Sequence, residues 1–566
     1  MQTSTILSTS LRFMRKGLLG LRRARDCKFS ILNFQFSIPL PSSTLPRAKP
    51  REQHCHSPER AGVRGENAAR PSCIVCLPIL ILLCFARSTT SAPQLAWEAR
   101  HNFGLPSLTN QVVAMTMDNS GNIIIAGSQA TPSGDLDYVV LKYSQSGTRQ
   151  WVKTYGSGPL ANDQLRAITV DSNGNVYVTG TSATLKYSSS GLLRWVRSYA
   201  GRGLAVDSNE FVYVVGFQTN DFATVKLSPE GTNVWLRTFD RGLANDIAQI
   251  VALGPAGEVY TGGIVTWACD QFSCYVWLEL VKYDVDGNQL WTRDFDTTGG
   301  LHAYDSEVKK LVVLDSNRIY AGGNFTGQGS PYRATMLDAA GTNQWHFATG
   351  ATDGGMTAMA VQPSGEVYMT GWIHAVPTIF YRTIALSTDG NRRWQVDVGP
   401  SGTYHRANGI ALDGLGNVFV TGQAANSYFW PPPSFDFLTI KYDNDGHELW
   451  TKRYNGPANG HDIATSIAVT PDGGIFVAGT SANTNGGTDI VLIKYVDIQN
   501  IQWLPKGAVL LQFPASPGQS VRFQASTNLT TWQDIATVSA SAEGIARYTD
   551  TTFSKYPHRF YRTVTP

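Results

Sequence analysis

Residues 167–180 read Ala167-Ile-Thr-Val-Asp171-Ser-Asn-Gly174-Asn-Val-Tyr-Val-Thr-Gly180, and this stretch decides the fold. Two strand-like runs flank an Asp-x-x-Gly turn, where Gly takes the positive φ that a short hairpin connection needs. The second run is apolar on both faces, so we expect neighbouring sheets to cover it on both sides. The stretch therefore predicts a β-hairpin stacked between similar hairpins.

The hairpin recurs with a mean spacing of roughly 50 residues, the length range of propeller blades. Its copies end at Gly127, Gly180, Gly216, Gly262, Gly322, Gly371, Gly422 and Gly479. Most copies continue into a strand such as Leu141-Lys142-Tyr143 and then into a Gly-x-x-x-Trp element. That element occurs at Gly147/Trp151, Gly191/Trp195, Gly231/Trp235, Gly287/Trp291, Gly341/Trp345, Gly390/Trp394 and Gly446/Trp450. We predict an all-β propeller of eight four-stranded blades over residues 93–495, with seven blades as the alternative if the short third copy forms no full blade.

The eighth copy stops at Tyr495 without its Trp strand, and the missing strand stands at the other end of the repeats, at Trp97–Phe103. We expect this amino-terminal strand to complete the last blade, because circular closure removes an open sheet edge.

At these residues the sequence resembles the bacterial β-propeller repeat family SBBP, with its Asp-x-x-Gly-Asn-Val-Tyr-Val-Thr-Gly hairpin and Lys-Tyr strand. The resemblance implies seven blades and an extracellular or surface location, so the count of eight departs from it. The Gly-x-x-x-Trp strand is also similar to the tryptophan-docking strand of eight-bladed quinoprotein dehydrogenases. The adjacent-cysteine pair of that family is absent from the sequence.

The amino-terminal region predicts export. Residues 74–86 form an apolar run of signal-peptide type, preceded by Arg64 and Arg70 and followed by small residues up to a cleavage site after Ala92. We assign residues 63–92 to a signal peptide, with a single anchoring helix or a buried strand as the alternatives, and expect no stable membrane span in the mature chain. Residues 1–62 are basic and lack any strand or helix period, and we interpret them as a non-native or disordered leader.

Charge and composition exclude some partners. Residues 93–566 contain 32 Lys and Arg against 39 Asp and Glu, which argues against nucleic acid. Residues 496–566 leave the repeat and show five short strand-like runs, which predict a small β-sandwich. Its stretch Gln524–Trp532, with Phe560-Tyr-Arg562, resembles carboxy-terminal sandwich modules of secreted bacterial proteins.

The search for catalytic motifs gives little. The sequence has no Gly-x-Ser-x-Gly elbow, no His-Glu-x-x-His and no phosphate-binding Gly-x-x-x-x-Gly-Lys, and its histidines occur singly in the repeats. Asp284-Val-Asp286-Gly287 and Asp443-Asn-Asp445-Gly446 look like calcium loops but lack a distal acid, so we interpret them as turns. We predict neither a metal nor a cofactor. The repeated Lys of the third strand is expected to pack between blades with its head on a turn acid.

What breaks a repeat is where a specific site is expected. Here the connections from second to third strand vary most and share one face. Their candidate binding residues are aromatic or polar: Trp267, Phe272, Tyr275, Trp277, Trp372, His374, Tyr428, Phe429 and Trp430. Aromatic rings there suit sugar rings or a protein partner, although the same rings could simply cover the blades. Cys269 and Cys274 are predicted to form a disulfide.

The sequence thus favours an exported, monomeric, non-catalytic propeller that binds a polysaccharide or a protein at the cell surface or outside the cell. The alternative is a secreted enzyme on the same scaffold: a quinoprotein-like dehydrogenase, a polysaccharide lyase or a hydrolase.

Overall fold

The computed structural model describes residues 93–102, 108–240, 246–269, 274–294, 307–325, 330–350, 353–427, 434–470, 473–496, 501–504, 507–514, 518–528, 531–541, 545–556 and 559–564. The predicted leader and signal peptide lie outside these residues. In the part described, no helix is long and apolar enough to span a membrane.

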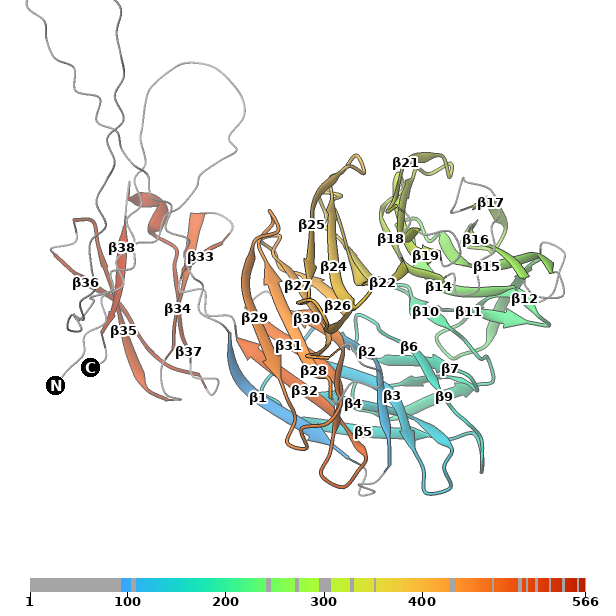
Figure 1. Cartoon of the computed structure of the whole chain (residues 1–566), viewed down its shortest axis with the longest axis horizontal. Helices are drawn as coiled ribbons and strands as arrows, with labels where there is room; N and C mark the ends of the chain where they lie inside the picture. Colours follow the sequence, from blue (N-terminus) through green and yellow to red (C-terminus); the bar gives the residue numbers. More distant parts are fainter. Residues whose placement is uncertain are drawn as a thin grey trace, which may run out of the picture.

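Within the described residues, the strands up to Val496 form antiparallel sets of four, which we number as sheets 1 to 8 (Figure 1). Sheets 6 and 7 are joined by one parallel pair, Ile379 of β24 opposite Tyr404 of β26. Sheet 1 contains β2 (Asn110–Met117), β3 (Ile123–Ala130), β4 (Leu136–Tyr143) and β5 (Arg149–Tyr155), and sheet 2 contains β6 (Leu165–Val170), β7 (Val176–Gly180), β8 (Thr184–Tyr187) and β9 (Leu193–Arg197). Sheet 3 contains β10 (Gly203–Val206), β11 (Val212–Gln218), β12 (Asp221–Leu227) and β13 (Asn233–Phe239), and sheet 4 contains β14 (Ile247–Leu253), β15 (Val259–Cys269), β16 (Cys274–Tyr283) and β17 (Gln289–Asp294).

Sheets 5 to 8 repeat the order. Sheet 5 contains β18 (Glu307–Asp315), β19 (Arg318–Phe325), β20 (Ser330–Leu337) and β21 (Asn343–Ala348), and sheet 6 contains β22 (Asp353–Val361), β23 (Val367–Ala375), β24 (Thr378–Leu386) and β25 (Arg392–Val398). Sheet 7 contains β26 (Tyr404–Leu412), β27 (Val418–Ala425), β28 (Asp436–Tyr442) and β29 (Glu448–Tyr454), and sheet 8 contains β30 (Asp462–Val469), β31 (Gly474–Ala482), β32 (Thr488–Val496) and β1 (Gln94–His101).

The fourth strand of sheet 8 comes from the amino-terminal end of the repeats. β1 pairs antiparallel with β32, from Gln94 opposite Val496 to His101 opposite Ile490, and the two lie side by side in Figure 1. The first strand of each sheet contacts that of the next, and β30 of sheet 8 contacts β2 of sheet 1.

The Asp-x-x-Gly prediction is confirmed in sheet 2. Asp171 Oδ1 accepts hydrogen bonds from the backbone N–H groups of Asn173 and Asn175, and Gly174 has a φ of 77°. All five residues of the following strand, β7, are buried. A residue with a Cβ is strained at this φ, so the turn favours glycine, although sheet 3 has Glu210 at the same position with a φ of 64°.

The Gly-x-x-x-Trp element joins neighbouring sheets. The indole of Trp195 in sheet 2 lies against Gly231 of sheet 3, where an added Cβ would come within 2.9 Å of the ring. Trp195 Nε1 also donates to the carbonyl of Pro229 in the same turn, at 2.9 Å. The same contact joins Trp97 of β1 to Gly147 and the Gln145 carbonyl of sheet 1. Only a glycine turn lets the indole approach this closely.

The third-strand lysines lie between sheets as predicted. Lys142 is buried, forms an ion pair of 2.8 Å with Asp118 of its own sheet, and donates to the Ser189 carbonyl of the next. Burial alone would raise the pKa of Asp118, but hydrogen bonds from Lys142 and Asn122 hold it below its ordinary value. These lysines therefore build the repeat and are not a ligand site.

The carboxy-terminal residues form two three-stranded sheets. The first contains β33 (Ile501–Leu504), β34 (Ala508–Pro514) and β37 (Ile545–Asp550), and the second contains β36 (Gln533–Ser539), β35 (Ser520–Ser526) and β38 (Phe560–Val564). A 3-10 turn, η2, spans Phe553–Lys555. Val509 and Leu511 of the first sheet share a core with Val521 and Phe523 of the second. β33 was not expected from the sequence.

Candidate functional site

The predicted site residues of sheets 4 and 7 are only partly described. Phe272, Tyr428, Phe429 and Trp430 lie outside the described residues. Trp267 lies in β15 and Tyr275 in β16, with backbone alone described. The interpretation of these two as loop residues is wrong, because the hairpin strands continue through them.

The cysteine prediction and Trp277 fall on the same hairpin. Cys269 and Cys274 are register partners across β15 and β16, an arrangement that allows a cross-strand disulfide, which stays a prediction. Trp277 pairs in register with Val265 and packs against the core cluster that holds Val265 and Phe222. Its ring thus contributes to the core of sheets 3 and 4.

Trp372 and His374 lie on β23 of sheet 6, two residues apart and therefore on one side of the strand. Both stand at the end of the sheet where its first strand begins, which we call the start face. The indole of Trp372 lies over Gly355 of β22, where an added Cβ would come within 3.0 Å of Nε1. The glycine thus makes room for the indole.

Arg406, on β26 of sheet 7, covers part of the Trp372 ring. Its guanidinium carbon lies 5.5 Å from the ring centroid, within the range of a cation–π contact. The Nε of Arg406 is buried and has no acceptor among the described residues. A buried donor without an acceptor costs free energy, so Arg406 Nε needs an oxygen acceptor, which a water molecule or a ligand can supply.

A histidine–carboxylate pair extends the same surface. His374 Nδ1 lies 2.9 Å from Asp353 Oδ2, and the Asp353 side chain is 68 % exposed. From sheet 5, the Asn324 amide lies near Gly355 on the side away from sheet 7. We name Asn324, Asp353, Trp372, His374 and Arg406 the start-face cluster. It offers one aromatic face with charged and amide groups around it.

Backbone bulges hold the strands that carry this cluster. β26 is bulged between Ala407 and Gly409, and the amide of the bulged Asn408 donates to the Ala464 carbonyl of sheet 8. β22 is bulged between Met356 and Ala358, and Thr357 donates to the Ala407 carbonyl. Bulges of this kind redirect side chains next to binding sites. Here they also fix sheets 6, 7 and 8 against one another.

Two basic side chains on or next to other first strands have lowered pKa values. Desolvation lowers the pKa of Lys310 on β18. Burial, and then the charge of Arg166, lower the pKa of Arg202, which directly precedes β10.

The repeated aspartates hold loops. Asp163 accepts hydrogen bonds from the Ser157 N–H and hydroxyl, and Asp462 accepts one from the Gly456 N–H. In the calcium-like stretch, Asp284 Oδ1 accepts the N–H groups of Asp286 and Asn288, as a turn requires. Among the described residues, no three His, Cys, Asp or Glu side chains gather as metal ligands.

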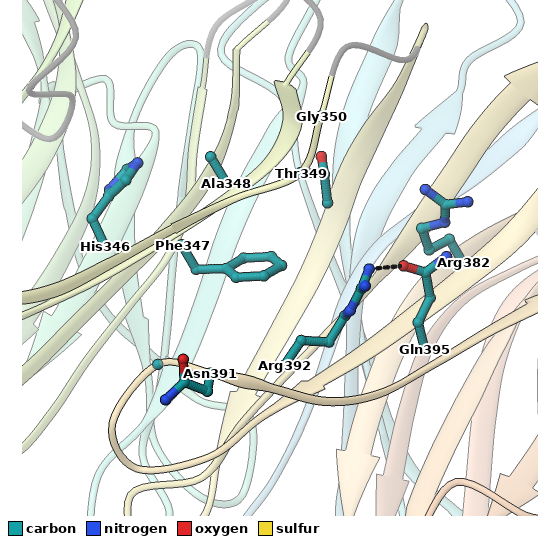
Figure 2. A pocket seen from close by; sticks show the side chains of 10 residues that line it. His346, Phe347, Ala348, Thr349, Gly350, Arg382, Asn391, Arg392 and Gln395 are labelled. Carbon is teal, nitrogen blue, oxygen red and sulfur yellow. Dashed lines mark hydrogen bonds between the residues drawn. The ribbon is translucent and has the colours of Figure 1, made fainter.

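A cavity of about 590 Å³ lies away from the start-face cluster, between β21 of sheet 5 and β25 of sheet 6 (Figure 2). Its lining includes Phe347 of β21, Arg392 and Gln395 of β25, and Gly390 of the turn before β25. None of these residues was predicted as a site.

With this geometry in place, comparison with known proteins agrees with the repeat. Residues 150–184 match the family described as Beta-propeller repeat, SBBP. This matched stretch runs from β5 of sheet 1 to the start of β8 of sheet 2 and resembles that β-propeller repeat. No curated protein matches it.

Solved structures resemble the chain at low identity. Chaetomium thermophilum Sqt1 has a TM-score of 0.47 at 10% identity, with 70% of this chain and 97% of that chain covered. A protein of unknown function from Dyadobacter fermentans gives 0.36 at 9%, covering 72% and 100%. A quinonprotein alcohol dehydrogenase-like protein from Bacteroides thetaiotaomicron gives 0.34 at 16%, covering 53% and 68%.

The sequence analysis named Trp372 and His374 as candidate binding residues but did not name Arg406 and Asn324. Both missed residues lie on repeat strands, and the packing of sheets 5 and 7 against sheet 6 brings Arg406 over Trp372 and Asn324 near Gly355.

One feature of the amino-acid sequence could have indicated the cavity between sheets 5 and 6. The residue two after the docking Trp is Arg in sheets 2, 3 and 4, Lys in sheets 1 and 7, and apolar in sheets 5, 6 and 8, where it is Phe347, Val396 and Ala99. The large aromatic ring is found in sheet 5 alone among these eight positions.

Proposed function

We propose that this protein is an exported, non-catalytic propeller that binds a polysaccharide on its start face, at the cluster of Asn324, Asp353, Trp372, His374 and Arg406. The observation that carries the proposal is the contact between Trp372 and Arg406, whose buried Nε has no acceptor in the described part of the chain. An indole provides a flat surface for a sugar ring, and the guanidinium provides donors for its hydroxyl or acidic oxygens.

The proposal includes a closed ring of eight blades formed by sheets 1 to 8. Its support is the pairing of β1 with β32, the contact of β30 with β2, and the docking of Trp97 on Gly147. Closure brings the start-face ends of sheets 5, 6 and 7 together at the mouth of one central channel. A polymer chain lying across that mouth would meet the whole cluster.

Export is the second part of the proposal. It rests on the apolar run 74–86, its basic flank and the small residues that end at Ala92. Secretion of the mature chain or its exposure on the cell surface would give it access to polysaccharides. Recovery of the chain only from the cytoplasm would contradict this part.

The test is a glycan-array experiment on residues 93–566, followed by titration of the best polysaccharide with variants. Trp372→Ala and Arg406→Ala are each expected to weaken binding by about 2 kcal/mol, or roughly thirtyfold, since they remove the central contacts of the site. The matched control is Phe217→Ala, because Phe217 follows its hairpin glycine as Trp372 does and is 53% exposed. Thermal unfolding checks that each variant is folded.

Equal binding by wild type and by both cluster variants would contradict the proposed site. Release of shortened products from the bound polysaccharide would instead favour the alternative of a secreted lyase or hydrolase.

A further inference from the structure

An arginine joins sheets 2, 3 and 4 each to its successor, at the position two residues after the docking Trp. Arg237 shows the pattern: its Nε donates to the Gly287 carbonyl at 2.7 Å, its Nη2 donates to the Asp286 carbonyl, and its guanidinium lies over the Trp235 ring. Arg197 and Arg293 make the same contacts with the next turns. We call this contact the guanidinium clamp.

Sheet 5 lacks the clamp. Trp345 still docks on Gly390 and donates to the Thr388 carbonyl, so the turn of sheet 6 is in the usual place. The clamp position, however, is occupied by Phe347, which has no hydrogen-bond donor. Among the described residues nothing replaces the guanidinium at the carbonyls of Asp389 and Gly390. The groove between sheets 5 and 6 therefore keeps two backbone acceptors that sheets 3, 4 and 5 have satisfied.

The cavity of about 590 Å³ lies at this groove. Figure 2 shows the Phe347 ring directed from β21 toward Arg392 of β25, and a dashed line that joins Arg392 to Gln395. That hydrogen bond, from Nη1 to Gln395 Oε1 at 2.9 Å, is the one that Arg392 makes within the described residues. The nearby Arg382 is already neutralised by two hydrogen bonds to Asp397. Arg392 is thus an exposed cation without an acidic partner in the described chain.

The chemistry of the walls selects a ligand class. The volume suits one or two sugar rings. Phe347 offers a face for the C–H groups of a pyranose, the Gly390 carbonyl accepts from hydroxyl groups, and the Arg392 guanidinium can bind a carboxylate in a bidentate manner. A cationic ligand would be repelled by Arg392, and a neutral sugar would form no ion pair with the Arg392 guanidinium.

We propose that the groove between β21 and β25 is a binding site for an acidic sugar, with its carboxylate on Arg392 and its ring on Phe347. This site is separate from the start-face cluster and stands on different residues.

The experiment measures binding of tetragalacturonate to residues 93–566 by calorimetry, with carboxyl-reduced tetragalactose as the neutral probe. Phe347→Arg is expected to restore the clamp, fill the groove and weaken tetragalacturonate binding at least about tenfold, with unfolding temperature unchanged or raised. Arg392→Gln leaves the cavity open and is expected to weaken binding of the acid by a similar factor, without affecting any binding of the neutral probe.

The matched control is Arg293→Phe, which removes the clamp between sheets 4 and 5. Asn343 occupies the position of Arg392 there, so this variant is expected to gain no tetragalacturonate site. Trp372→Ala should leave tetragalacturonate binding unchanged, whatever happens to the polysaccharide of the start face.

Three results would overturn the assignment: no binding of tetragalacturonate by the wild type, unchanged binding by Arg392→Gln, or tighter binding of pentaglutamate than of tetragalacturonate with the same dependence on Arg392. The last would assign the groove to an acidic peptide.

Discussion

At the scale of single residues, His405 shows how burial controls charge near the start face. It is 4% exposed and packs edge-on against Tyr381, with ring centroids 6.0 Å apart. Burial, and then the positive charge of Arg453, lower the pKa of His405 to about 4. The imidazole is therefore neutral in the folded protein at pH 7, which suits a packing role and not proton transfer.

This pKa makes stability depend on pH. Between about pH 6.5 and pH 4 the unfolded chain binds a proton at His405 that the folded chain does not, so the free energy of unfolding falls as pH falls. A shift of this size corresponds to on the order of 3 kcal/mol. Urea unfolding at pH 7 and pH 4.5 should show a smaller loss for His405→Gln than for wild type. Equal losses would contradict the buried, neutral histidine.

At the scale of elements, the docking Trp of the fourth strand should contribute differently to stability in sheet 8 and in sheet 7. Trp97 Nε1 of β1 donates to the Gln145 carbonyl, whereas the buried Nε1 of Trp450 has no acceptor among the described residues. The reason is that sheet 8 takes its fourth strand from β1 and so has no turn from third to fourth strand for Trp450 to meet.

Two matched substitutions test this. Trp97→Phe removes a hydrogen bond and is expected to cost about 1 kcal/mol more than Trp450→Phe, which removes a donor without a partner. Each change removes the same part of the indole, but Trp450 is buried and Trp97 half-buried, so burial alone would make Trp450→Phe the costlier change, and a greater loss for Trp97→Phe reports the hydrogen bond. A larger loss for Trp450→Phe would contradict this explanation.

Elements of the repeat were predictable because their causes are local or periodic. The Asp171–Gly174 turn, the Lys142 contacts and the pairing of Trp97–His101 with the last hairpin all follow from spacing in the sequence. The neighbours of Trp372 were not predictable, because Arg406 reaches it only through the register of two sheets and their bulges. The groove at Phe347 has a signal in the sequence, the absence of the Arg found at this position in sheets 2, 3 and 4, but its meaning depends on the guanidinium clamp, which only the structure shows.

At the scale of the whole molecule, the strand β1 joins the two ends of the repeat. Its Arg100 donates to Asp489 at 3.0 Å, to Ser481 at 3.1 Å and to the Tyr454 hydroxyl at 2.8 Å, so one side chain ties β1 to sheets 7 and 8. Trp97 adds the contact with sheet 1. Without β1, the edge of β32 would be open, and sheet 8 would lose these contacts of β1 with sheets 1 and 7.

We therefore expect a chain that begins at residue 103 to be less stable than one that begins at residue 93. The unpaired edge at Ile490–Val496 is buried and apolar, so its exposure should promote aggregation, and the unfolding temperature should fall by on the order of 5 °C or more. A synthetic peptide of residues 93–102 should restore the temperature, because it supplies the missing strand. The same peptide with Trp97→Ala and Arg100→Ala is the control and should restore much less, since it keeps the backbone pairing but loses both anchoring side chains. If the shortened chain unfolds at the wild-type temperature and stays monomeric, β1 does not close the ring and the eight-bladed arrangement is wrong.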